Sequence, residues 1–160
     1  MSLSDILLRI MADGLVVPVV VVGGVAMLKV AADKRYQVVA RGVATGLIAL
    51  FFAGIARLLY QDGARPFQLL GVDPGAAYLD NPGFPSDHTL LVFTVTFVVW
   101  AATKNKTLGL SLLTLSVLVA TGRVLALVHT PADVAGGIAC ALLAAFVMYG
   151  KTLFRLDTTK

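Results

Sequence analysis

The chain contains only two histidines, and both lie among polar residues that interrupt an apolar sequence of 160 residues. The polar residues near His88 and His129 include Ser86, Asp87, Arg123 and Asp133, and Arg65 precedes them all. Two imidazoles can divide the work of phosphate hydrolysis, because a neutral ring attacks phosphorus and a protonated ring gives a proton to the leaving oxygen. This set of residue types therefore indicates phosphoryl chemistry.

The residues near each histidine indicate different roles for the two. Asp133 follows His129 by four residues, near enough across the start of a helix to hold one ring nitrogen and fix the tautomer. We therefore predict that His129 is the nucleophile and that Asp133 orients it. His88 stands at the start of an apolar run and is free to act as the acid.

A phosphate group also needs cations and donors. Arg65 and Arg123 offer guanidinium groups whose geometry matches phosphate oxygens. Ser86 and Thr130, the latter followed by Pro131, are typical residues at the start of a helix. Two helix N-termini are thus expected to open toward one site, and their unpaired amides favour an anion.

The elements that must position these residues belong in a bilayer. Hydrophobic residues make up 58% of the chain and charged residues 14%, and the mean hydropathy is +0.88, which a water-soluble domain of this length cannot accommodate. Apolar spans are predicted over residues 15–30, 38–60, 87–102, 107–128 and 131–149. The fold class is an all-α membrane protein, a bundle of five transmembrane helices plus a short interfacial helix over residues 2–11, in a single membrane domain over residues 1–160.

The Lys and Arg residues predict the orientation of the bundle. The connections that contain them are expected in the cytoplasm; these residues are Lys29, Lys34, Arg35, Arg41, Lys104, Lys106, Lys151, Arg155 and Lys160. The N-terminus, the connection over residues 61–85 and the residues around His129 then lie on the extracytoplasmic face.

The net charge of +4 is scattered, so a nucleic-acid partner is not expected, and the single cysteine, Cys140, excludes an internal disulfide.

Two motifs resemble the type 2 phosphatidic acid phosphatase superfamily. The family sequence proline-serine-glycine-histidine corresponds to Pro85-Ser86-Asp87-His88, with Asp87 in the glycine position. The family motif of serine-arginine, five residues, histidine, three residues and aspartate corresponds to Gly122, Arg123, His129 and Asp133. Gly122 stands where serine is usual.

A third motif, lysine, six residues and arginine-proline, is matched only in part. Arg65 and Pro66 are present, but Leu58 occupies the lysine position. Arg57, one residue earlier, is the candidate for the missing charge.

The resemblance implies an integral membrane hydrolase of a lipid phosphate. By that resemblance His129 forms a phosphohistidine, Asp133 orients it and His88 protonates the leaving group, while phosphate-binding residues are Arg65, Ser86 and Arg123, with Arg57 and Asp87 as further substrate-binding candidates. No cofactor and no catalytic metal is implied. The Asp87 variant resembles bacterial undecaprenyl-diphosphate phosphatases, which recycle the cell-wall lipid carrier at the outer face of the plasma membrane.

Several alternatives remain open at this stage. Asp133 and Ser86 could serve only as helix caps, Arg123 could extend from a span to the interface, and the histidines could lack chemistry or bind a haem. The substrate could be a glycerolipid phosphate or lipid A, the reaction could transfer phosphate to a hydroxyl, or the chain could transport lipid phosphates without catalysis. The oligomeric state is not predicted.

Overall fold

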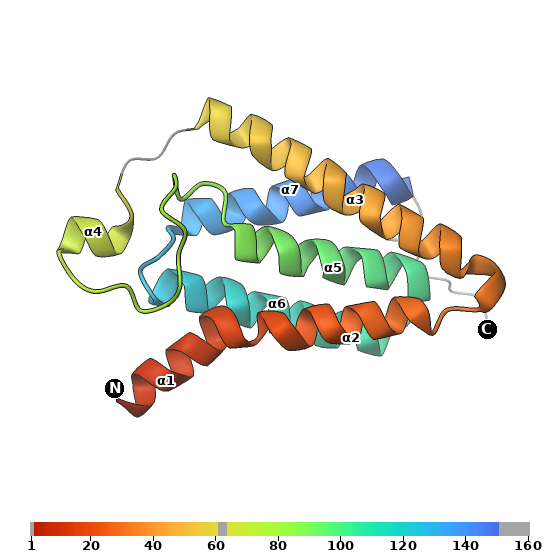
Figure 1. Ribbon diagram of the computed structural model, residues 1–160, viewed down its shortest axis with the longest axis horizontal. Coiled ribbons are helices and arrows are strands. Elements are labelled where there is room, and N and C mark those ends of the chain that lie inside the picture. Colours follow the sequence, from red (N-terminus) through yellow and green to blue (C-terminus); the bar gives the residue numbers. More distant parts are fainter. Residues whose placement is uncertain (1, 61–63, 151–160) are drawn as a thin grey trace.

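The computed structural model describes residues 2–60 and 64–150, and all regular elements in these two stretches are helical (Figure 1). They are α1 (Leu3–Arg9), the π-helix η1 (Ile10–Gly14), α2 (Val16–Leu28), α3 (Ala32–Leu59), α4 (Pro66–Leu70), α5 (Asp87–Thr103), α6 (Lys106–Leu125) and α7 (Pro131–Tyr149). The predicted all-helical class is confirmed.

Four stretches of the described chain are long and apolar enough to cross a membrane: Leu3–Leu28, Ala32–Leu59, Lys106–Leu125 and Pro131–Tyr149. The apolar helix α5 is shorter, with 17 residues. It packs against α2, α3, α6 and α7, so that neighbouring helices surround it (Figure 1). The chain is therefore a multi-pass membrane protein.

The N-terminal segment differs from the separate helix expected over residues 2–11. No loop divides α1 from α2, because η1 joins them and the amide of Leu15 donates to the carbonyl of Ile10 across five residues, at 2.8 Å. Figure 1 shows α1 turning away from the axis of α2 at this point. The π-helical turn thus bends one continuous rod at the edge of the bundle.

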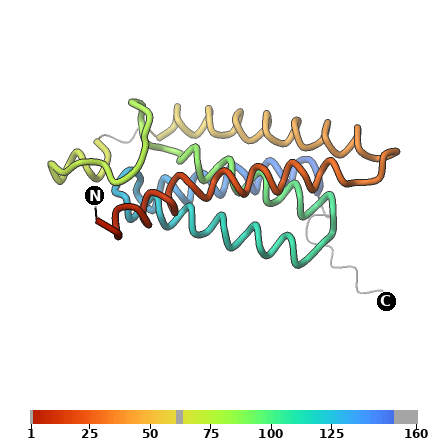
Figure 2. Tube along the Cα trace, turned by 60° about the horizontal axis from the view of Figure 1, so that its bottom comes forward, coloured from red at the N-terminus to blue at the C-terminus, as the bar shows by residue number. Residues whose placement is uncertain are grey.

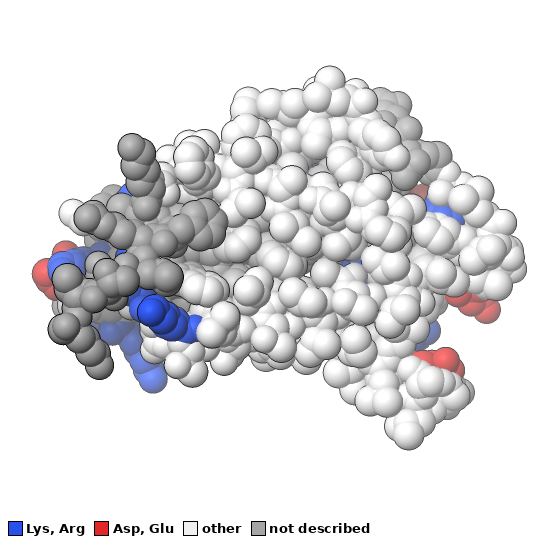
Figure 3. All heavy atoms as spheres, turned by 180° about the vertical axis from the view of Figure 1, so that it is seen from behind, with Lys and Arg blue, Asp and Glu red and all other residues white. Residues whose placement is uncertain are grey.

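The two ends of the bundle have different contents. The N-terminus, α4 and the connection between α6 and α7 lie at one end, and the turn between α2 and α3 lies at the other, in both Figure 1 and Figure 2. On the face shown in Figure 3, Lys and Arg gather mainly around the second end, and the surface between the ends is almost free of charge. This belt is the surface expected to face lipid.

Helices α5 and α7 approach each other closely at the end of the bundle that contains the N-terminus and α4. A Cβ at Gly137 of α7 would lie 2.8 Å from the carbonyl oxygen of Ser86, so only glycine fits there. The amide of Ser86 donates to the carbonyl of Asp133 at 3.0 Å. The first turns of α5 and α7 are consequently joined by a backbone hydrogen bond.

The outer connection packs on the loop that carries His129. The amide of Phe67 in α4 donates to the carbonyl of Leu127, and Gly75 donates to the carbonyl of Ala126, both at 3.0 Å. A small apolar cluster lies beneath these bonds and consists of Ala12, Phe67, Ala76, Ala126 and Val128. Leu127 adopts a left-handed conformation with φ of 60°, which turns the chain after the end of α6 toward His129.

Candidate functional site

His129 lies in the short connection between α6 and α7 and is 4% exposed. Its Nδ1 is 3.4 Å from Oδ2 of Asp133. The same oxygen accepts a 2.7 Å hydrogen bond from the amide of Thr130, and the Thr130 hydroxyl accepts one from the amide of Asp133. Asp133 therefore caps α7 and also faces the imidazole.

Burial controls the charge of the His129 ring. Burial lowers the pKa of His129 below its ordinary value of 6.5, and the nearby charges of Arg123 and Arg65 act in the same direction. The hydrogen bond with Asp133 opposes this effect only in part. The imidazole is accordingly neutral near pH 7. With Nδ1 directed at a carboxylate, Nε2 is left as the basic nitrogen.

Ser86 is fully buried at the N-cap of α5, as predicted, but its side chain makes no capping hydrogen bond. Its Oγ instead accepts a hydrogen bond from the Thr89 hydroxyl at 3.1 Å. The Ser86 hydroxyl proton is then available for another acceptor. The idea that Ser86 acts only as a cap is not supported by this geometry.

Arg123 is 1% exposed near the end of α6. Its Nη1 donates to Oδ1 of Asp13 at 2.5 Å, and its Nε is buried without a partner among the described residues. Because its charged end is inside the protein, Arg123 does not extend to the interface as a solvated cation.

His88 occupies the first turn of α5 with a partly buried side chain, and its Nε2 lies 3.5 Å from the same Asp13 oxygen. Asp13 is a contact of the site that the sequence motifs do not include. A signal was present, since an acidic residue beside a long apolar span is costly unless it has a partner. What the sequence could not show was which cation it would meet.

Arg65 is 6% exposed. It was predicted as a phosphate ligand, but protein oxygens already bind much of its guanidinium group. Its Nη1 donates to the carbonyl of Val128 at 2.6 Å, and its Nη2 donates to Leu79 and to Asn81 at 2.9–3.3 Å. Arg65 thus joins the outer connection to the residue before His129. Its remaining N–H groups are the part that could meet a ligand.

Arg57 and Asp87 form an ion pair between the end of α3 and the start of α5, with both side chains partly exposed. The charge of Arg57 does reach the site end of the bundle. It is directed to the acidic side chain that replaces the motif glycine, so Arg57 and Asp87 form one paired unit.

Two cavities meet at these residues. The smaller, of about 130 Å³, is lined by Arg65, Ala77, Tyr78, Leu79, Asn81, Asp87, His88 and Arg123. The larger is an almost wholly apolar groove of about 520 Å³ between α3 and α5, lined by residues that include Gly46, Leu50, Leu91 and Thr94. Leu79 and Asp87 line both. His129 and Ser86 are buried and do not line either cavity.

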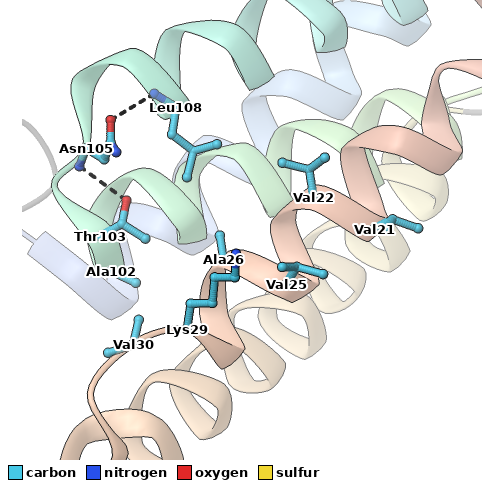
Figure 4. Close-up of a pocket in the computed structure, with 10 residues that line it drawn as sticks. All are labelled: Val21, Val22, Val25, Ala26, Lys29, Val30, Ala102, Thr103, Asn105 and Leu108. Atoms are coloured by element: carbon cyan, nitrogen blue, oxygen red, sulfur yellow. Dashed lines mark hydrogen bonds between the residues drawn. The ribbon is translucent and has the colours of Figure 1, made fainter.

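A further cavity of about 610 Å³ lies at the opposite end of the bundle, between α2, α5 and α6 (Figure 4). Aliphatic side chains from α2, α5 and α6 contribute to its lining, and Lys29 is its one charged lining residue. It contains none of the predicted site residues. Within residues 2–60 and 64–150, no group of three or more His, Cys, Asp or Glu is arranged to hold a metal ion.

The apolar bundle, with imidazoles, guanidinium groups and a helix N-terminus at one end, defines a membrane protein whose site is suited to an anion. The chain belongs to the PAP2 superfamily, because the family model with that description matches residues 37–156. Neither the curated proteins nor the solved structures yield a match. Members of the superfamily are phosphatases, so a lipid phosphatase activity is indicated.

Proposed function

We propose that this protein hydrolyses undecaprenyl diphosphate to undecaprenyl phosphate and inorganic phosphate at the extracytoplasmic face of the plasma membrane. The observation that carries the proposal is the buried pair of His129 and Asp133, with Nδ1 and Oδ2 3.4 Å apart. A neutral imidazole with a fixed tautomer is the group that attacks phosphorus.

The reaction is proposed to take place in two steps. In the first, Nε2 of His129 forms a bond to the terminal phosphorus, the bond to the bridging oxygen breaks, and His88 gives its proton to that oxygen. In the second, water attacks the phosphorus of the phosphohistidine and His88 takes a proton from the water. The bond between phosphorus and Nε2 breaks, its electron pair returns to His129, and phosphate is released. Each histidine ends the cycle as it began.

The charge of the transferred phosphate is assigned to side chains and to the start of α5. Arg123 offers its Nε, which has no partner among residues 2–60 and 64–150, and Ser86 offers its hydroxyl proton. Arg65 contributes mainly by holding the loop beside His129. Preorganised donors of this kind stabilise developing charge better than water does, because they do not reorganise during the reaction.

The apolar groove between α3 and α5 is proposed to receive the lipid chain. It shares Leu79 and Asp87 with the polar cavity, so a chain lying in the groove would bring its phosphate to His88 and Arg123. Groove and cavity together would admit the substrate sideways from the bilayer. In this arrangement α5 spans the membrane with α3, α6, α7 and the N-terminal rod, and the C-terminus is cytoplasmic.

A transporter would need polar binding groups that become accessible from both membrane faces. The cavity at the opposite end offers only Lys29 among charged residues (Figure 4). The one-sided distribution of the site residues therefore favours catalysis over transport.

Trapping of the covalent intermediate tests the proposal. Purified protein mixed with substrate carrying a radioactive terminal phosphate should retain acid-labile, alkali-stable label, and His129→Ala should retain none. Label on both proteins, or turnover by His129→Ala, would contradict the assignment of the nucleophile. Parallel assays with a phosphatidic acid and lipid A, with and without a chelator, would show whether the lipid and the absence of a metal are correctly proposed.

A further inference from the structure

Asp13 contacts two of the proposed functional residues from a segment outside the match to the family, which begins at residue 37. One oxygen, Oδ1, lies 2.5 Å from Nη1 of Arg123 and 3.5 Å from Nε2 of His88. The other, Oδ2, accepts a hydrogen bond from the amide of Ala77 at 2.9 Å. The carboxylate is thus fixed from three directions.

The backbone of η1 reaches Arg123 because Gly122 has no side chain. A Cβ at Gly122 would lie 2.7 Å from the amide nitrogen of Ala12 and 2.8 Å from the carbonyl carbon of Met11. Both are backbone atoms of the N-terminal rod, so they cannot yield as the end of a flexible side chain would. The glycine in place of the motif serine therefore permits the approach that delivers Asp13.

Asp13 leaves room for a phosphate on the same guanidinium group. It engages Nη1, whereas Nε of Arg123 is buried with no partner in the described residues. A guanidinium group presents five N–H donors, so a carboxylate and a phosphate can bind different edges together. The geometry does not require Asp13 to leave when substrate arrives.

The two histidines are consequently paired with carboxylates in similar ways. Oδ2 of Asp133 lies 3.4 Å from His129, and Oδ1 of Asp13 lies 3.5 Å from His88. The first pair suits a neutral nucleophile that needs a fixed tautomer. The second suits an acid, because a carboxylate stabilises the imidazolium form that gives up the proton.

We infer that Asp13 is a positioning residue of the phosphatase site, holding Arg123 in its buried position and His88 ready to protonate the leaving oxygen. This inference rests on the proposed function. The proton moves from His88 to the oxygen as the bond between phosphorus and oxygen breaks, and Asp13 compensates the charge of His88 until then.

The test compares two soluble substrates on each variant, hexyl phosphate and p-nitrophenyl phosphate. An alkoxide needs a proton to leave, whereas nitrophenolate does not, so loss of acid catalysis lowers only the first rate strongly. We expect Asp13→Asn to lower kcat/KM for hexyl phosphate by about 10²-fold and for p-nitrophenyl phosphate by less than about tenfold. The ratio of the two rates is independent of the fraction of folded protein.

Further variants complete the design. Asp5→Asn is the control and should leave the ratio unchanged, because Asp5 is exposed and its side chain accepts a hydrogen bond from the amide of Ser2 at the start of α1. In Asp13→Glu the ratio of the two rates should lie between those of Asp13→Asn and the wild type, because the negative charge is kept. Gly122→Ala should reproduce the selective loss, since its Cβ displaces η1. Equal losses on both substrates in Asp13→Asn would overturn the inference while leaving the proposed function intact. The same conclusion would follow if Asp13→Asn bound the phosphate analogue orthovanadate more tightly than the wild type and turned over both substrates at undiminished rates. A wild-type protein that hydrolyses neither these two substrates nor undecaprenyl diphosphate would overturn both.

Discussion

The backbone amide of Ser86 donates a 3.0 Å hydrogen bond to the backbone carbonyl of Asp133. This bond joins the first turns of α5 and α7, two helices that supply His88 and the partner of His129. The two proposed halves of the chemistry are therefore fixed to each other through the main chain.

The dependence of the rate on pH should reflect the burial of His129. The ring must be neutral to attack, and burial lowers its pKa below 6.5. As the pH falls, kcat/KM should stay high through pH 6.5 and decline only at lower pH. A profile of kcat/KM between pH 4 and 9 in detergent measures this. An acidic limb centred above pH 6.5 would contradict the lowered pKa.

Asp133→Asn should separate orientation of the imidazole from capping of α7. An amide oxygen can still accept the hydrogen bond from Thr130, so the helix should remain folded, but the tautomer of His129 is no longer fixed. We expect kcat to fall by about 10²–10⁴-fold. Thr130→Ala is the converse control, because it removes a cap and should lower the free energy of unfolding by about 1 kcal/mol. Similar kinetic losses in both variants would mean that capping alone is responsible.

Arg123 and Arg57 should differ in importance for the reaction. Arg123 is buried and its Nε has no partner in the described part of the chain, whereas Arg57 is partly exposed and paired with Asp87. Arg123→Ala should lower kcat/KM by about 10²-fold or more, and Arg57→Ala by less than about tenfold. Rates should be compared at equal folded protein, measured by thermal unfolding. A larger effect of Arg57→Ala would show that Arg57 takes over the role of the missing motif lysine.

The groove between α3 and α5 can be filled from Gly46. A Cβ at Gly46 meets no atom within 4 Å, so Gly46→Phe should fold and place its ring in the groove. We expect kcat/KM to fall about tenfold for the long-chain lipid and to stay unchanged for p-nitrophenyl phosphate. Gly54→Phe is the matched control, since Gly54 lies on the same helix in open space outside the groove. Equal behaviour of the two variants would place the lipid elsewhere.

Much of this architecture could be predicted from the sequence because it depends on local patterns. Apolar runs broken by charged turns predict the helices, and Thr130 followed by Pro131 and Asp133 predicts the start of α7. The distribution of Lys and Arg predicts which loops share an end of the bundle. The start of α5, whose first turn includes His88, and the connection before α7, which contains His129, lie at the same end (Figure 1).

Other features depend on contacts between distant segments. Arg65 has the residue type of a phosphate ligand, but three carbonyl groups from two loops occupy much of its guanidinium group. Asp13 lies 110 residues from Arg123 in the sequence, and no periodicity connects them. The bend at η1 that brings them together is a small departure from helical geometry, to which hydrophobic patterns are insensitive.

The shape of the groove has a consequence for how such a protein could diversify. One wall consists of residues of α3, while the buried polar groups come from the N-terminal rod, the outer connection, α5, α6 and the loop before α7. Substitutions on the groove face of α3 can therefore change which hydrocarbon is accommodated and leave the reacting groups undisturbed. A library confined to Val43, Gly46, Leu47 and Leu50 is the natural starting point for redirecting the protein toward other lipids.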